Sequence, residues 1–276
     1  MAIKAAATTK KAPAKSASAH VTTKKKTVTS APASASSSAL VGHVRGSLRS
    51  VALWRALGAE FIGTFLLASV IVAGQGQPIF VLFALVGVIL LVGSISGAHV
   101  NPAMTFGALV TRRIGWLRGV GYIVAQLLGA ALAFVVLSAF IAGAGVAEEA
   151  EVFGQTAPVL FSAVDVATLV GKEWYIFFAE VLGASILGFA VASMARAKDT
   201  LTSAFAGGLG IFIALMVAVS AANYVGGSAI INPAVAIALQ AYNLESLWPF
   251  AVYAVAPVLG GVAGFIIHDL LRGRTA

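Results

Sequence analysis

The tripeptide Asn-Pro-Ala occurs twice in this chain of 276 residues, at 101–103 and at 232–234, and the sequence around it repeats too. SGAHVNPAMT surrounds the first copy and GGSAIINPAVAI surrounds the second. Upstream of these, AEFIGTFLLAS matches AEVLGASILGFA, and downstream YIVAQLLGAALA matches YAVAPVLGGVAG. The chain is therefore built from two related halves, one over about 51–142 and the other over about 173–271.

Each half contains three apolar stretches that are long enough to cross a membrane, because a helix needs about 20 apolar residues to span a bilayer. Only 10% of the residues are charged, against about 25% in an ordinary soluble domain, which excludes a soluble globular protein. Two further apolar stretches, 101–110 and 232–241, are too short to cross, and each begins with Asn-Pro-Ala. The six predicted spans lie at about 53–73, 78–95, 117–142, 173–195, 202–221 and 247–270.

The positive charges predict the orientation, since cytoplasmic loops are enriched in Lys and Arg. After residue 50 the chain has nine such residues; eight are predicted on the side of the basic N-terminal segment, and only Lys172 on the other. An even number of spans also requires both termini on one side. We therefore expect a multi-pass protein of the cell membrane, in contact with the lipid bilayer and with both termini in the cytoplasm.

Three spans per half is an odd number, so the second half must be inserted upside down relative to the first. The two short stretches then enter from opposite faces and meet near the middle of the membrane, where inverted-repeat proteins carry their functional sites. Asn is a favoured N-cap and Pro a favoured first helical residue, so each tripeptide predicts the start of a half-helix. The positive ends of two helix dipoles would then converge beside the side-chain amides of Asn101 and Asn232. Such a point repels cations but lets a neutral hydrogen-bonding solute pass.

These motifs resemble those of the aquaporin family, also called major intrinsic proteins. The resemblance covers residues 51–272 and rests on AEFIGTF, SGAHVNPAMTFG, AQLLGA, the second INPA and PVLGG. It implies an all-α membrane protein with six transmembrane helices and two re-entrant half-helices in two inverted repeats. It also implies a homotetramer with a pore in every subunit, through which water or small neutral solutes pass passively. The residues that the resemblance assigns to the pore are Asn101, Pro102, Ala103, Asn232, Pro233 and Ala234.

The predicted selectivity filter departs from the family pattern. Val235 follows the second Asn-Pro-Ala, where the family usually has an Arg that narrows the outer pore and adds a positive charge. Counting from the motifs, the other filter positions are Val81, Ser220 and Ala229, so the filter is wide and mostly apolar. Either the pore accepts solutes larger than water, such as glycerol, urea or peroxide, or its apolar ring dewets and passes water poorly. Ala236 stands where glycerol facilitators usually have Asp, which argues against a close relative of that subgroup.

Two carboxylates fall inside predicted spans, Glu60 and Glu180, at matching places in the two halves. We predict a structural role, in which each accepts hydrogen bonds from the irregular backbone that leads into its half-helix. The alternative is a secondary transporter of a small solute that uses the inverted repeat and in which Glu60 or Glu180 titrates. Proton-dependent, saturable flux would distinguish this transporter from a passive channel.

Four glycines are predicted where spans pack closely, because small residues let transmembrane helices approach each other. They are Gly58, Gly63, Gly129 and Gly183. Their expected role is in packing and not in the pore.

The N-terminal segment differs in composition from the rest. Residues 1–48 consist largely of Ala, Ser, Thr, Lys and Pro, which predicts a disordered basic cytoplasmic tail before a channel domain at 49–276. No aromatic side chains interleave its lysines, so we expect no nucleic-acid partner. The chain has no Cys, and we find no phosphate loop and no His/Asp/Glu grouping at the midplane. We therefore expect no metal, no cofactor and no enzymatic activity.

Overall fold

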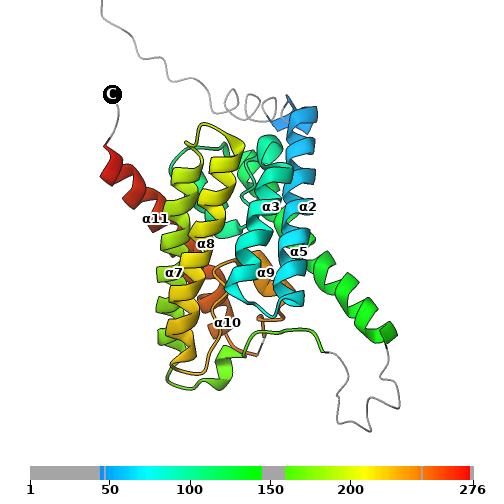
Figure 1. Cartoon of the computed structure of the whole chain (residues 1–276), viewed down its shortest axis with the longest axis vertical. Coiled ribbons are helices and arrows are strands. Elements are labelled where there is room, and N and C mark those ends of the chain that lie inside the picture. Colours follow the sequence, from blue (N-terminus) through cyan, green and yellow to red (C-terminus); the bar gives the residue numbers. More distant parts are fainter. Residues whose placement is uncertain (1–43, 47, 145–158, 244, 274–276) are drawn as a thin grey trace, which may run out of the picture. The chain divides into compact units, whose positions relative to one another are not determined.

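Six long apolar helices dominate the computed structural model of the chain, which describes residues 44–46, 48–144, 159–243 and 245–273 (Figure 1). The predicted all-α membrane fold is confirmed. The last span consists of a short α10 (Trp248–Phe250), a π-helical turn η2 (Ala251–Val255) and α11 (Ala256–Arg272). The other five are α2 (Val51–Ala73), α3 (Pro78–Ser96), α5 (Trp116–Ala144), α7 (Glu173–Met194) and α8 (Thr200–Asn223).

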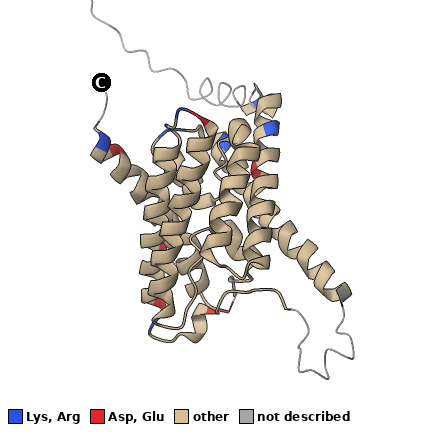
Figure 2. Cartoon of the chain, viewed as in Figure 1, with Lys and Arg blue, Asp and Glu red and all other residues tan. Residues whose placement is uncertain are grey.

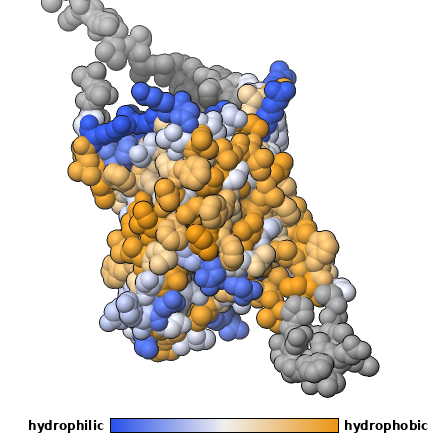
Figure 3. All heavy atoms as spheres, viewed as in Figure 1, coloured by the Kyte–Doolittle hydropathy of each residue, from blue (hydrophilic) through white to orange (hydrophobic). Residues whose placement is uncertain are grey.

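The surface of the bundle has the layering expected of a membrane protein. Hydrophobic side chains cover its middle, and hydrophilic ones gather toward its two ends (Figure 3). Most of the Lys and Arg residues drawn lie at the end where α2 begins (Figure 2). Most of the predicted tail at 1–48 lies outside the described residues.

Close approach of backbones holds the long helices together in two matching pairs. A Cβ added at Gly129 of α5 would clash with the backbone of Phe61 in α2, and one added at Gly264 of α11 would clash with the backbone of Ser185 and Phe189 in α7. Without side chains at these points, the helices pack at backbone distance, as small residues allow in membranes.

The prediction of close-packed glycines is confirmed at three positions and wrong at the fourth. Cβ atoms added at Gly63, Gly129 and Gly183 would all fall within 3 Å of a neighbouring helix or loop. One added at Gly58 would have no described heavy atom within 4 Å. Gly58 points away from its neighbours because it lies on the face of α2 opposite the buried Glu60 and Ala56.

The two short stretches form half-helices, α4 (Pro102–Val110) and α9 (Pro233–Ala238). Each packs chiefly against the third helix of the other half, α4 against α11 and α9 against α5. α9 ends earlier than the predicted stretch of 232–241, because the Leu239 carbonyl accepts a hydrogen bond from Ala163 N at 2.9 Å and Gln240 takes a positive φ of 54°. The exchange of half-helices interlocks the two halves of the chain.

The sixth span is less regular than the continuous helix that the sequence predicts. Pro257 has no N–H to donate to the Tyr253 carbonyl, so the helix loses one bond of its ladder at that point. The backbone opens into the π-turn over Ala251–Val255, and the phenolic O–H of Tyr242 donates to the Tyr253 carbonyl at 3.1 Å. The same hydroxyl is 3.0 Å from the Pro233 carbonyl, so Tyr242 joins this turn to α9.

Candidate pore

The two Asn-Pro-Ala asparagines cap the half-helices with their side-chain oxygens. Asn101 Oδ1 accepts from Ala103 N at 2.8 Å, and Asn232 Oδ1 accepts from Ala234 N at 3.0 Å. The proline that follows each asparagine has no N–H and needs no hydrogen-bond acceptor. The first backbone N–H of each half-helix, that of the alanine, therefore finds its acceptor in the asparagine side chain. Both side chains are thereby oriented with their amide nitrogens pointing away from their own helix.

Each amide nitrogen reaches across to the other half of the chain. Asn101 Nδ2 donates to the Ile231 carbonyl at 2.9 Å, and Asn232 Nδ2 donates to the Val100 carbonyl at 2.9 Å. Each Nδ2 carries two hydrogens and this bond uses one. Within the described part of the chain, one N–H per asparagine is therefore left to donate to a solute, and the two donors are held in fixed positions.

The carbonyls that receive these bonds are aimed by an unusual backbone. Val100 and Ile231 have φ angles of 40° and 53°. Positive φ is sterically unfavourable for β-branched residues and costs on the order of 1–3 kcal/mol each. The conformation turns the carbonyl of the residue before each motif toward the opposite asparagine.

Two buried carboxylates stabilise this backbone. Glu60 accepts from His99 N at 3.0 Å and Val100 N at 2.7 Å, and Glu180 accepts from Ile230 N and Ile231 N. Both carboxylates have no exposed surface. Their oxygens are occupied by the loop N–H groups that would otherwise be unsatisfied inside the membrane.

The first half adds a side-chain network that the second half lacks. Gln126 Nε2 donates to Glu60 at 2.7 Å and lies 3.0 Å from Thr105 Oγ1, which is 3.3 Å from His99 Nδ1. The matching positions in the second half are Pro257, Ala236 and Ile230, which carry no polar side chain. Sequence reasoning missed Gln126 and Thr105. Aligning the two halves and looking for polar residues present in only one of them would have found both.

A cavity lies between the two half-helix starts and includes both asparagines in its lining. It encloses about 10 Å³, which is about the space of one water molecule. Among the described residues, no Lys, Arg, Asp or Glu lines it; besides the asparagines and the His99 imidazole its walls are apolar, with Met104 and Met194 among them. The site thus offers two fixed amide donors in an uncharged and mostly apolar passage.

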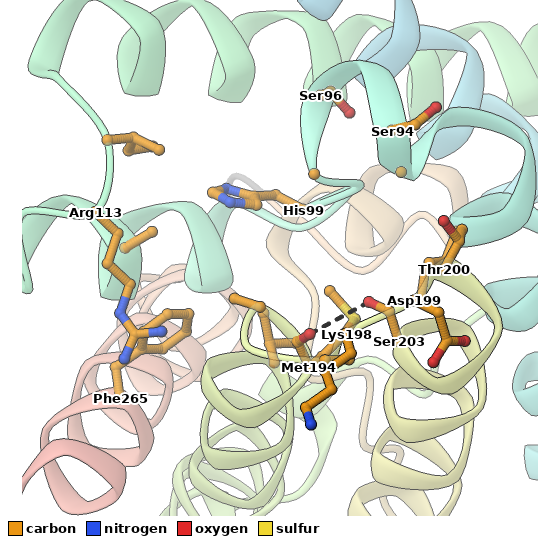
Figure 4. A pocket seen from close by; sticks show the side chains of 18 residues that line it. Ser94, Ser96, His99, Arg113, Met194, Lys198, Asp199, Thr200, Ser203 and Phe265 are labelled. Carbon is orange, nitrogen blue, oxygen red and sulfur yellow. Dashed lines mark hydrogen bonds between the residues drawn. The ribbon is translucent and has the colours of Figure 1, made fainter.

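A larger cavity of about 460 Å³ opens at the end of the bundle where α3 and α7 end and α8 begins. His99, from the loop after α3, and Met194, at the end of α7, lie on facing sides of it (Figure 4). Its rim is polar, with Lys198, Asp199 and Ser203. We call it the mouth cavity.

The four predicted filter positions are not gathered around either cavity. Val81 and Val235 are buried in α3 and α9, and Ala229 is half-buried in the loop before α9. Ser220 is exposed in a surface hollow that Tyr175 and Tyr224 also line. The filter stays a prediction for all four residues.

Among the described residues, no three of His, Cys, Asp and Glu are grouped so as to hold a metal ion.

The family comparison agrees with this geometry. The model of the family described as major intrinsic protein matches residues 47–268. The chain belongs to this family. It is 34% identical over 218 residues to glycerol uptake facilitator protein-like 6 of Lactiplantibacillus plantarum, which covers 74% of this chain and 92% of that protein.

A second sequence relative and a solved structure are also similar to this chain over most of its length. Lens fiber major intrinsic protein of Rattus norvegicus is 32% identical over 243 residues, 81% of this chain and 83% of that protein. The X-ray structure of the aquaglyceroporin from Plasmodium falciparum has the same fold, with a TM-score of 0.57 and 21% identity over 79% of this chain and 96% of that chain.

This chain is a passive membrane channel for water or small neutral solutes, and the secondary transporter is not favoured.

Proposed function

We propose that the channel conducts glycerol-class solutes, with urea and peroxide as further candidates, together with water. The observation that carries this proposal is the pair of asparagine amides, each with one N–H that has no partner among the described residues, in a small cavity that no described charged side chain lines. A solute with hydroxyl or carbonyl oxygens can exchange its water partners for these donors, while an ion loses its hydration without compensation.

Two features favour a solute larger than water. Val235 replaces the Arg that usually narrows the outer pore, so no cationic side chain occupies that position. A relative that is 34% identical is named glycerol uptake facilitator protein-like 6, although Ala236 stands where glycerol facilitators usually have Asp. Val81, Ser220 and Ala229 complete the proposed filter.

The proposed assembly is a homotetramer in a cell membrane, with both termini in the cytoplasm and a pore in each subunit. The mouth cavity then faces the cytoplasm, because Arg113, Lys198 and the nearby Arg196 lie at that end. We propose the boundary between the basic tail and the channel domain at about residue 48. The protein transports without catalysing a reaction and needs no cofactor, metal or nucleic acid.

Stopped-flow light scattering on proteoliposomes tests this function. The wild-type protein is expected to speed water efflux under a sucrose gradient and re-swelling under glycerol, relative to empty liposomes. Val235→Arg is expected to reduce glycerol permeability by about tenfold while water permeability changes less. Val235→Met lengthens the side chain without adding charge and serves as the matched control. Water, glycerol and urea rates equal to those of empty liposomes, with the protein folded, would overturn the proposal.

A further inference from the structure

Four side chains line both the mouth cavity and the small cavity at the asparagines. They are Ile89 of α3, His99 of the following loop, and Val191 and Met194 of α7. The mouth cavity of about 460 Å³ meets the small cavity of about 10 Å³ at these side chains. We call these four residues the inner neck, because a solute that crosses between the two cavities must pass them.

The apolar walls of the inner neck have little room to withdraw. Ile89, Val191 and Met194 are at most 7% exposed although they line a cavity. Gly207 of α8 packs against two of them: a Cβ added there would lie 2.8 Å from Met194 Sδ and 2.5 Å from Ile89 Cδ1. Ile89 and Met194 therefore pack closely against α8 at Gly207.

The polar wall is fixed as well. The His99 backbone N–H is bonded to Glu60, and the imidazole Nδ1 lies 3.3 Å from Thr105 Oγ1. The ring also packs edge-on against Tyr122, with centroids 5.4 Å apart. In the described part of the chain this leaves Nε2 as the ring nitrogen free to meet a solute, so the neck offers one hydrogen-bonding group opposite three apolar side chains.

None of the four predicted outer filter residues lines either cavity. Val81, Ala229 and Val235 are small or medium apolar residues in place of the bulky or charged groups that narrow a pore. The inner neck, in contrast, combines a thioether, two β-branched side chains and an imidazole at the junction of the two cavities.

We propose that the inner neck, and not the outer filter, sets the rate of passage and the upper size limit for solutes in this channel. This inference rests on the proposed function. A mostly apolar constriction controls passage both by its width and by the ease with which water leaves it. Within the neck, His99 Nε2 is the one side-chain group of the four that can hydrogen-bond to a solute hydroxyl.

Matched valine substitutions test the inference. Val191→Ala and Val191→Leu widen and narrow the inner neck, while Val235→Ala and Val235→Leu make the same changes at the outer filter. Permeabilities to water, glycerol and erythritol are measured by stopped flow in proteoliposomes and divided by the amount of folded protein. Met194→Ala is a second widening variant, so the test does not depend on one substitution that fails to fold.

Under this inference Val191→Ala and Met194→Ala raise glycerol permeability by about threefold or more and raise erythritol permeability by a larger factor. Val191→Leu lowers both, and the Val235 pair stays within about twofold of wild type. Flux that appears only in the widened neck variants also supports the inference, because the wild-type neck is then the closed point. A response of the Val235 pair as large as that of the Val191 pair overturns it while leaving the channel function intact. If wild type and all variants are impermeable, both the inference and the proposed function fail.

Discussion

Arg113 forms a 2.6 Å salt bridge to Asp269, joining the loop after α4 to the end of α11. The same guanidinium donates to the Ala192 carbonyl at the end of α7, at 3.1 Å, and its Cζ lies 4.9 Å from the centre of the Phe265 ring. One side chain therefore ties the first half-helix to two helices of the second half.

Arg113→Lys is expected to lower the free energy of unfolding by about 1 kcal/mol, because an ammonium cannot keep the fork of donors and the stacking on Phe265 together. Asp269 is 41% exposed, so solvent screening keeps the loss modest. The measurement is thermal unfolding of the purified protein in detergent. Arg112→Lys is the matched control, since Arg112 is exposed and shares the loop. Equal melting temperatures for the two variants would contradict the role of Arg113.

Glu60→Gln is expected to destabilise the protein more than Glu180→Gln. Glu60 accepts three hydrogen bonds, from two loop N–H groups and Gln126, whereas Glu180 accepts the two loop N–H groups. A glutamine amide presents N–H to at least one of these donors, and a buried unsatisfied donor costs about 1–3 kcal/mol. Unfolding temperatures of the two variants give the comparison.

Glu180→Gln also distinguishes a passive channel from a secondary transporter. If the carboxylates are structural, glycerol flux per folded protein in Glu180→Gln keeps the pH dependence of wild type. Loss of a pH-driven component of the flux in that variant would instead favour titration of the carboxylate.

Tyr242→Phe is expected to cost about 1–3 kcal/mol of stability, because it removes the hydroxyl hydrogen bond to the Pro233 and Tyr253 carbonyls inside the protein. Tyr224→Phe provides the control, since Tyr224 is 90% exposed and the same hydroxyl is lost without burial. Denaturation curves for both variants are recorded in one detergent. A smaller loss for Tyr242→Phe than for Tyr224→Phe would show that the π-turn does not depend on this contact.

Gly264→Ala and Gly58→Ala are expected to change stability in opposite directions. An added Cβ at Gly264 meets the backbone of α7, while one at Gly58 meets no described atom. Alanine is favoured over glycine in a helix by about 0.5–1 kcal/mol, so Gly58→Ala gains stability when nothing opposes it. Gly264→Ala forces α7 and α11 apart and is expected to unfold or aggregate. Expression level and size-exclusion profiles of both variants check this.

The positions of the long helices could be predicted from the sequence to within two or three residues. The predicted span at 173–195 and the observed α7, Glu173–Met194, are an example. Span length and apolarity are local properties, since the bilayer imposes them on each segment separately. The start of each half-helix is local as well, because Asn-Pro-Ala contains its own cap and its own first residue.

The features that depend on distant contacts could not be predicted in this way. The end of α9 is set by a hydrogen bond from Ala163, and the π-turn in the sixth span is supported by Tyr242. Gly58 and Gly129 look alike in sequence, yet only Gly129 touches another backbone. Neighbouring residues do not reveal which face of a helix meets its partner.

The sequence by itself determined that this chain is a membrane protein of two inverted halves with two paired half-helix starts. Only the tertiary structure decided that Asn101 bonds to Ile231 and Asn232 to Val100, which leaves one amide hydrogen on each without a partner among the described residues. The inner neck, too, exists only in three dimensions, since Ile89, His99 and Val191 come from three separate segments. Membrane insertion and helix capping act over a few residues, whereas the shape of the passage depends on side chains that folding brings together from across the chain.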